Sequence, residues 1–218
     1  MSDIKVIITG ATGMVGEGVL FECLQNPKVS DVLIINRRHY ELNHPKLKEL
    51  IVPDFFQLGK VASVIEGYDA CFFCAGVSSV GMKEEKYRYL TYDTTLAFAK
   101  SLIAVNDKLV FVYVSGAGTD SSEKGRMMWA RVKGKTENDL IRLPFKAAYN
   151  FRPGVMLPFD GQKNWKSTYK FIGKIIKAIS PKRVLSMQEV GRAMINTVTI
   201  GYTKQILEAA DIKQLANA

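Results

Sequence analysis

The chain has few of the residues that cross-link small proteins or bind metals. Among its 218 residues are three cysteines and two histidines. Three cysteines are too few, and odd in number, for a disulfide framework, which favours a reducing cytoplasm. Cys71 and Cys74 have the spacing of a redox pair, but they lie in an apolar run typical of a strand. Strand residues three apart point to opposite faces, so we interpret both as structural. With no second cysteine pair and no paired histidines, we expect no metal site.

Long hydrophobic runs are also missing. No apolar stretch reaches the ~18–20 residues that span a bilayer. The N-terminus lacks the basic start, apolar stretch and small-residue cleavage site of a signal peptide. We therefore expect neither a membrane span nor an export signal. A basic amphipathic helix is predicted over residues 169–179, where it would cover a substrate cleft or make a subunit contact; membrane-surface binding is the alternative.

Acidic residues are in deficit. Thirty lysines and arginines face 21 aspartates and glutamates, for a formal charge of +9. Such a balance suits nucleic acid, a membrane surface or anionic small molecules. The basic residues are spread along the chain and form no recognised nucleic-acid module. We interpret the charge as a solvated surface with a bias toward a phosphorylated ligand. Nucleic-acid binding is a weaker reading, and a homo-oligomer is left open.

Strand-like apolar runs alternate with helical periodicity. We expect strands at residues 5–9, 32–36, 50–52, 69–74, 109–115 and 147–151, helices at 14–25, 83–105 and 124–143, and mostly helices from 165 onward. This alternation predicts an α/β fold, a Rossmann-type doubly wound parallel sheet in three αβα layers with strand order 3-2-1-4-5-6. Residues 1–218 are expected to form a single NAD(P)-binding domain, with a small substrate-side region at about 153–187 and C-terminal helices.

The first strand-to-helix turn carries the main functional signal. Gly10 permits a tight turn, Gly13 lets the backbone approach a pyrophosphate, and Gly16 lets the helix pack close to the sheet. The helix N-terminus offers free N–H groups and a partial positive charge to phosphates. The predicted phosphate-binding residues are Gly10, Thr12, Gly13, Met14, Val15 and Gly16.

The end of the second strand indicates which nucleotide is bound. NAD enzymes usually place a carboxylate there, to bind the ribose 2′-hydroxyl. Here Arg37 and Arg38 follow the strand, and no carboxylate occurs until Glu41. Guanidinium groups suit a 2′-phosphate through bidentate, charge-assisted bonds. We predict NADP(H), against the alternative that both arginines are simply solvated.

With these motifs the chain resembles the atypical short-chain dehydrogenase/reductases, in their NAD(P)H-binding, nucleoside-diphosphate-sugar-epimerase-like branch. The resemblance covers nearly the whole chain, from the cofactor turn at residues 9–16 to the last helix at 208–216. It implies that Asp54 contacts adenine. It further implies that Cys74, Ala75 and Gly76 line the ribose and diphosphate, and that Pro153, Gly154 and Val155 pack beside the nicotinamide.

The resemblance also implies an active site, from which this chain departs. Ser115 and Lys133 match the catalytic serine and lysine, which orient the substrate and hold the cofactor ribose. The family's tyrosine, which exchanges a proton with the substrate, is replaced by Trp129. An indole N–H donates a hydrogen bond but is no acid or base near neutral pH. The motif therefore predicts cofactor placement better than turnover.

Other residues are candidates for the proton donor in place of the missing tyrosine. Tyr92 is the best of three tyrosines near the start of the long helix, which also include Tyr87 and Tyr89. Tyr113 is expected in the core, and His39 and His44 are expected near the adenine end.

Two functions follow from these residues. The first is an NADP(H)-dependent oxidoreductase that acts on a small carbonyl or alcohol. The second is a non-catalytic NADPH-binding regulatory or sensor protein, because Trp129 replaces the tyrosine.

Overall fold

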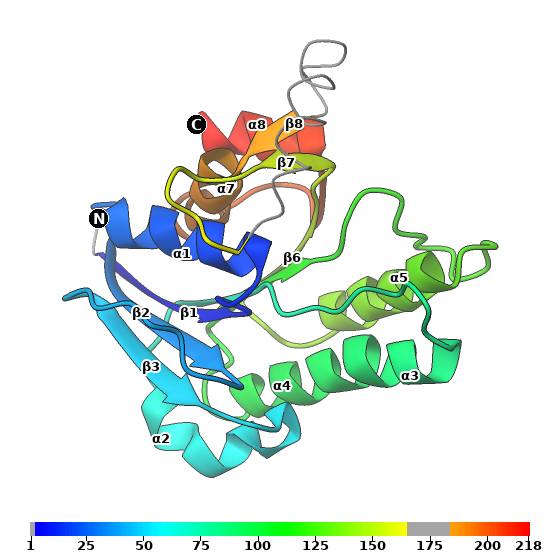
Figure 1. Cartoon of the computed structure of the whole chain (residues 1–218), viewed down its shortest axis with the longest axis horizontal. Coiled ribbons are helices and arrows are strands. Elements are labelled where there is room, and N and C mark those ends of the chain that lie inside the picture. Colours follow the sequence, from blue (N-terminus) through cyan, green and yellow to red (C-terminus); the bar gives the residue numbers. More distant parts are fainter. Residues whose placement is uncertain (1–2, 165–183) are drawn as a thin grey trace.

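A parallel β-sheet forms the centre of the molecule. A computed structural model of the chain describes residues 3–164 and 184–218 (Figure 1). The sheet has seven strands in the order β3-β2-β1-β4-β5-β6-β9, and each neighbouring pair is parallel. Its strands are β1 (Ile4–Thr9), β2 (Val29–Asn36), β3 (Leu47–Ile51), β4 (Ala70–Phe73), β5 (Val110–Val114), β6 (Ala147–Arg152) and β9 (Ile206–Glu208). The predicted Rossmann-type sheet and the order of its first six strands are confirmed.

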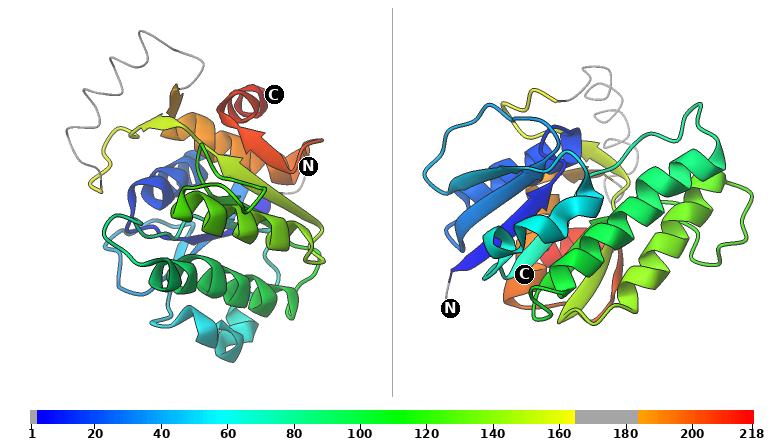
Figure 2. Two further views of the ribbon diagram at one scale, coloured as in Figure 1. Left: turned by 90° about the vertical axis from the view of Figure 1, so that its right-hand side faces the viewer. Right: turned by 90° about the horizontal axis from the view of Figure 1, so that it is seen from below.

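Helices cover both faces of this sheet (Figures 1 and 2). Val6 and Ile8 of β1 belong to one core, and Ile7 between them belongs to the other. This alternation is the period of two expected when both faces of a strand are buried. The helices of the first face are α1 (Met14–Gln25), α7 (Met187–Thr199) and α8 (Ala209–Ala216). Those of the second are α4 (Thr94–Ile103), α5 (Met128–Ile141) and the short pair η1 (Phe55–Val61) and α2 (Ala62–Ile65).

The predicted separation of two cysteines is confirmed by these two cores. Cys71 of β4 is buried in the core under α4, whereas Cys74 packs against the core under α1. Burial raises the pKa of the Cys74 thiol to about 12. It also raises the pKa of the Cys71 thiol well above its usual value. Neither thiol forms a reactive thiolate near neutral pH, so both are structural.

The expectation of helices from residue 165 to the end is wrong at two short strands. β8 (Val184–Ser186) pairs with β7 (Val155–Leu157) in a second, two-stranded sheet, and β9 extends the main sheet beyond β6. Each of β7, β8 and β9 has three residues, too few to show an alternating pattern in sequence. The predicted amphipathic helix at 169–179 lies outside the described residues.

The long predicted helix at 83–105 is interrupted. It consists of α3 (Glu84–Arg88), a π-helical turn η2 (Tyr89–Asp93) and α4. Such turns occur frequently at functional sites, and this one faces a pocket described below. The next predicted helix begins at Met128 rather than 124, because Glu123 has a φ of 61° and the N-cap Met127 is extended.

Candidate nucleotide-binding and catalytic site

The glycine turn between β1 and α1 is closely packed. Gly10 has a φ of 75°, and a Cβ atom there would lie 2.7 Å from the backbone nitrogen of Ala75. A Cβ on Gly16 would lie 2.1 Å from the carbonyl oxygen of Gly10. Both positions therefore require glycine for the fold itself, since no side chain can be accommodated at either.

Gly13 has a different role. It is the N-cap of α1 in an extended conformation, and its N–H donates to the Gly10 carbonyl at 2.9 Å. A Cβ on Gly13 would meet only that carbonyl oxygen, at 3.4 Å, so the protein itself tolerates a side chain there. The open side of Gly13 lies at the end of α1 where unpaired N–H groups of Met14 and Val15 gather. A diphosphate would fit this space, and glycine is required for its approach.

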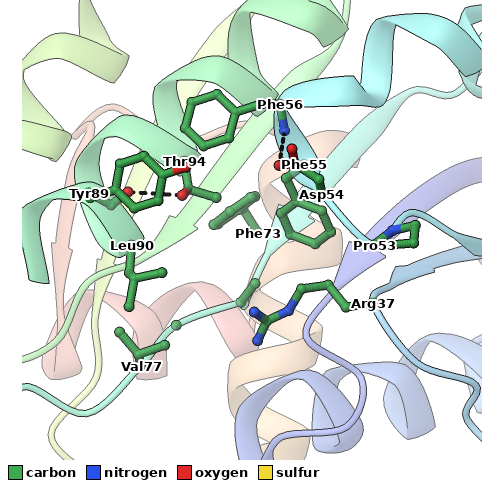
Figure 3. A pocket seen from close by; sticks show the side chains of 12 residues that line it. Arg37, Pro53, Asp54, Phe55, Phe56, Phe73, Val77, Tyr89, Leu90 and Thr94 are labelled. Atoms are coloured by element: carbon green, nitrogen blue, oxygen red, sulfur yellow. Dashed lines mark hydrogen bonds between the residues drawn. The ribbon is translucent and has the colours of Figure 1, made fainter. Parts of the chain in front are cut away.

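A pocket of about 120 Å³ lies beside this turn, between the ends of β2, β3 and β4 and the π-helical turn (Figure 3). Its aromatic side is formed by Phe55, Phe56, Phe73 and Tyr89. Phe56 and Tyr89 stack with ring centroids 5.5 Å apart. The remaining lining residues are Arg37, Pro53, Asp54, Ala75, Gly76, Val77, Leu90 and Thr94. This composition suits a flat, aromatic base such as adenine.

A second pocket, of about 220 Å³, connects the first to the glycine turn through shared residues. Arg37, Phe55, Ala75 and Gly76 line both pockets. The second pocket is otherwise lined by Gly10, Thr12, Gly13, Ile35, Asn36, Arg38 and Cys74. Nine of the residues predicted to bind the nucleotide thus line one continuous groove: Gly10, Thr12, Gly13, Arg37, Arg38, Asp54, Cys74, Ala75 and Gly76.

The two arginines of this groove are exposed. In Figure 3 the guanidinium group of Arg37 points into the pocket. Within residues 3–164 and 184–218, neither Arg37 nor Arg38 makes a side-chain hydrogen bond or ion pair. Two uncompensated cations therefore lie where β2 ends, near the expected position of an adenosine ribose. Asp54 is engaged differently, because its carboxylate accepts a hydrogen bond from the N–H of Phe56 at 3.0 Å.

The predicted catalytic residues lie at the same sheet edge, after β5. Ser115 follows that strand and is 3% exposed. Its hydroxyl donates to the carboxylate of Glu137 and lies 3.1 Å from the carbonyl oxygen of Phe151. The ammonium of Lys133 donates to the backbone carbonyl of Ser115. The structure thus brings Ser115 and Lys133 together and adds a buried carboxylate, Glu137, that we did not predict.

Glu137 is fully buried and forms an ion pair with Arg152 at the end of β6. The Nε of Arg152 donates to its carboxylate at 3.0 Å, and a second guanidinium nitrogen donates to its other oxygen. Arg152 also pairs with exposed Glu208 at 3.2 Å. A sequence signal existed: Trp129, Lys133 and Glu137 are spaced by four on α5 and therefore share one face.

Burial changes the acidity of the lysine. It lowers the pKa of Lys133 from 10.5 to about 8, although the nearby Glu137 carboxylate acts in the opposite direction. Desolvation disfavours the charged form of a buried amine. Lys133 is therefore able to lose its proton within about two pH units of neutrality, which an exposed lysine does not do.

Trp129 stands in the tyrosine position and is half-buried, with its ring 3.4 Å from where a Cβ of Gly118 would lie.

Tyr113, Tyr92 and Tyr89 do not replace the family's tyrosine as a proton donor. Tyr113 is 2% exposed and its pKa is raised by burial. Tyr92 donates its hydroxyl to Asp139 at 2.7 Å, and desolvation raises its pKa too. Tyr89 belongs to the adenine-sized pocket.

Both histidines lie between β2 and β3, on the side of the sheet where we expect the adenine end of the nucleotide. His39 contacts Glu49 of β3, and the N–H of Lys46 donates to His44 at 3.2 Å.

The three residues expected beside the nicotinamide follow directly after β6. The Pro153 carbonyl accepts a hydrogen bond from the N–H of Ala117, and Val155 begins β7. Neither Pro153, Gly154 nor Val155 lines the two pockets above.

Among the residues that the structure describes, no group of three histidine, cysteine, aspartate or glutamate residues is arranged to hold a metal ion. None of their helices combines the length and apolar character needed to cross a bilayer.

Comparison with known proteins identifies relatives of this fold. The model of the NAD dependent epimerase/dehydratase family matches residues 6–124. Protein HTATIP2 of Rattus norvegicus is 28% identical over 203 residues, covering 91% of this chain and 82% of the relative. Protein fmp52, mitochondrial, of Emericella nidulans is 26% identical over 204 residues, with coverages of 88% and 86%.

Solved structures share the architecture at lower identity. Uronate dehydrogenase from Agrobacterium tumefaciens has a TM-score of 0.70 at 14% identity, covering 96% of this chain and 77% of its own. A short chain dehydrogenase family protein from Francisella tularensis has a TM-score of 0.66 at 16% identity, with coverages of 95% and 96%. Bordetella bronchiseptica WbmF, solved with NAD+, has a TM-score of 0.69 at 14% identity, covering 99% of this chain and 78% of its own. At these identities the likeness concerns the fold.

Proposed function

Since the chain belongs to the NAD dependent epimerase/dehydratase family, we propose that it is an NADP(H)-dependent oxidoreductase that acts on a small carbonyl or alcohol. The observation that carries the nucleotide assignment is the pair of guanidinium groups of Arg37 and Arg38, which line the groove and have no side-chain partner among the described residues. A 2′-phosphate would supply the negative charge that these groups lack. A bare 2′-hydroxyl would leave both cations uncompensated.

In this proposal each part of the nucleotide contacts its own set of residues. Adenine would occupy the aromatic pocket, with Phe55 and Phe73 as its apolar wall. The 2′-phosphate would contact Arg37 and Arg38, and the diphosphate would lie against Gly13 at the start of α1. The nicotinamide would then extend toward Lys133, Pro153, Gly154 and Val155.

In this proposal Lys133 takes over the role of the missing tyrosine. NADPH, when bound, would supply the hydride that reduces the carbonyl carbon of the substrate. The Lys133 ammonium gives a proton to the carbonyl oxygen, which leaves an alcohol and a neutral amine that solvent reprotonates. The lowered pKa of about 8 keeps the amine mostly protonated at neutral pH while making it a better acid than an ordinary lysine. The Ser115–Glu137 pair holds the backbone that orients this amine.

The second candidate is a non-catalytic NADPH-binding sensor. It is favoured by Trp129 in the tyrosine position and by the Ser115 hydroxyl, which is engaged with Glu137 rather than free for a substrate. Both candidates use the same cofactor groove, so nucleotide binding does not distinguish between them. Turnover with a panel of small aldehydes and ketones does.

Calorimetric titration with NADPH and, separately, NADH tests the nucleotide assignment. We expect micromolar affinity for NADPH, at least tenfold weaker affinity for NADH, and loss of that difference in Arg37→Ala/Arg38→Ala. The matched control is Lys48→Ala/Lys5→Ala, which removes two charges elsewhere on the same sheet. Equal affinity for both nucleotides, or no binding of either, would contradict the assignment.

The proposal also covers the substrate side of the domain and the cell compartment. The region at about 153–187, of which residues 165–183 lie outside the described part of the chain, would form the substrate side of the single domain. The chain would act in a reducing compartment such as the cytoplasm. All three cysteines are unpaired, which fits such a compartment. Because the Emericella nidulans relative is called mitochondrial, fractionation of cells that express the tagged chain is the direct test.

A further inference from the structure

A carboxylate on a neighbouring strand closes the loop that presents Arg37 and Arg38. Glu49 lies on the edge strand β3, and its side chain is 17% exposed. One of its oxygens, Oε1, accepts from the side-chain amide of Asn36 at 3.1 Å and from the N–H of Tyr40 at 2.9 Å. Its other oxygen contacts the ring of His39. One oxygen atom therefore joins both ends of the turn at residues 37–39.

The position of Glu49 follows from the sheet. In the β2–β3 pairing, Glu49 lies opposite Ile34. Asn36 is two residues further along β2 and therefore points to the same face as Ile34. The Glu49 side chain thus reaches the last residue of β2, directly before the two arginines. The main-chain bond from Val52 to the Asn36 carbonyl, 2.8 Å long, continues the pairing beyond it.

A second carboxylate holds the far end of the same loop. The Tyr40 hydroxyl donates to Glu17 at 2.8 Å, and Glu17 is fully buried in the first turn of α1. Tyr40 is thereby tied to β3 by its backbone and to α1 by its side chain. The arginines themselves remain exposed and unbonded within the described residues, so the orientation of their backbone depends on these anchors.

We propose that Glu49 is a positioning residue for nucleotide selection: by closing the turn at residues 37–39, it pre-orients Arg37 and Arg38 toward the 2′-phosphate. This inference rests on the proposed function. Pre-organisation raises affinity because the loop loses less conformational freedom on binding. Glu49 does not contact the nucleotide, and its charge alone acts against an anionic ligand.

The negative charge of Glu49 and its hold on the turn have opposite effects on phosphate binding, and this difference makes the inference testable. If Glu49 acted only through its charge, then its removal would strengthen the binding of a phosphate. If it acts by holding the turn, then its removal weakens that binding. The side-chain length and the charge are separable, because Glu49→Asp keeps the charge but shortens the reach, whereas Glu49→Gln keeps the reach and an acceptor oxygen but removes the charge.

The experiment uses 2′,5′-ADP (adenosine 2′,5′-bisphosphate) and 5′-AMP as probes, which differ in the 2′-phosphate alone. The full-length chain and its variants are titrated calorimetrically with each. We expect Glu49→Ala and Glu49→Asp to weaken 2′,5′-ADP binding by at least fivefold while 5′-AMP binding changes by less than twofold. Glu49→Gln should stay within twofold of the unmodified chain for both probes. The matched control, exposed Glu41→Ala, removes the same charge from the same loop and should leave 2′,5′-ADP binding unchanged or slightly tighter.

Several outcomes would overturn the inference. Tighter 2′,5′-ADP binding in both Glu49→Ala and Glu41→Ala would mean that Glu49 acts through charge. Equal weakening of both probes would mean general damage to the groove. If Glu49→Ala does not fold, Glu49→Asp serves as the test. Unchanged 2′,5′-ADP binding in Glu49→Asp would also overturn the inference. The failure of the proposed function would give a different result: the unmodified chain itself would not bind 2′,5′-ADP more tightly than 5′-AMP.

Discussion

The hydroxyl of Ser115 donates a hydrogen bond to the buried carboxylate of Glu137. The same carboxylate binds the Arg152 guanidinium, and the Ser115 carbonyl accepts from Lys133. Four residues, one directly after β5, two on α5 and one at the end of β6, are therefore linked where the resemblance places catalysis. The serine belongs to this internal network, so its hydroxyl contributes to the position of Lys133 more directly than to a substrate.

The substitution Trp129→Tyr restores the tyrosine of the family. Trp129→Tyr should leave NADPH affinity within twofold and raise carbonyl reduction at least tenfold, because a phenol near Lys133 is a suitable proton donor. Steady-state kinetics and calorimetry measure the two effects. Trp129→Phe, which has no acidic group, is the control and should not gain activity. Loss of NADPH binding in Trp129→Tyr would show instead that the indole forms part of the cofactor site.

The lowered pKa of Lys133 predicts a pH dependence. The protonated amine is the acid in carbonyl reduction, so kcat/KM should be constant below about pH 8 and fall by about tenfold per unit above it. Lys133→Arg stays protonated across this range and should lose both the activity and the pH dependence. NADPH affinity, measured over the same pH range, separates proton donation from cofactor loss. An activity that rises through pH 8 would exclude Lys133 as the acid.

Glu137 should matter strongly for stability. Glu137→Ala leaves the Arg152 guanidinium, with an 11% exposed side chain, without its buried partner. Breaking a buried ion pair in this way costs about 3–5 kcal/mol in the free energy of unfolding. The exposed partner Glu208 is the control, and Glu208→Ala should cost less than about 1 kcal/mol. Chemical denaturation measures both. The double variant Glu137→Met/Arg152→Met should be more stable than Glu137→Ala, and equal or greater loss would contradict the ion-pair explanation.

Two glycines of the cofactor turn should respond differently to alanine. Gly13→Ala meets only the Gly10 carbonyl at 3.4 Å, so the free energy of unfolding should change by less than about 1 kcal/mol. Its NADPH affinity should fall at least tenfold, because the methyl group occupies the diphosphate's path. Gly16→Ala places a methyl group 2.1 Å from the same carbonyl and should lose about 1–3 kcal/mol of stability.

The reverse pattern would contradict these assignments. A destabilised Gly13→Ala chain that binds NADPH normally, or a fully stable Gly16→Ala chain, would mean that the turn differs from the one described. Thermal unfolding and calorimetry on the same preparations give both quantities.

Much of the fold follows from local sequence. The buried strands β1, β2, β4, β5 and β6 are rich in apolar residues, and the helix α1 was predicted with its observed bounds. The three-residue strands β7, β8 and β9 were not predicted, because so few residues carry no periodicity. The π-helical turn at Tyr89–Asp93 was missed for a related reason: one widened turn changes the helical period too little to be seen in the sequence.

By itself, the sequence determined the chemistry available at the nucleotide site. It places glycines where the backbone is crowded, Arg37 and Arg38 after β2, and Trp129 where the family has tyrosine. Tertiary structure decided which side chains those residues meet. The contacts of Ser115 with Glu137, and of Glu49 with the arginine loop, join elements 22 residues apart along the chain in one case and neighbouring strands in the other. Such contacts arise when the sheet is assembled and its faces are buried, and no local pattern of residues encodes them.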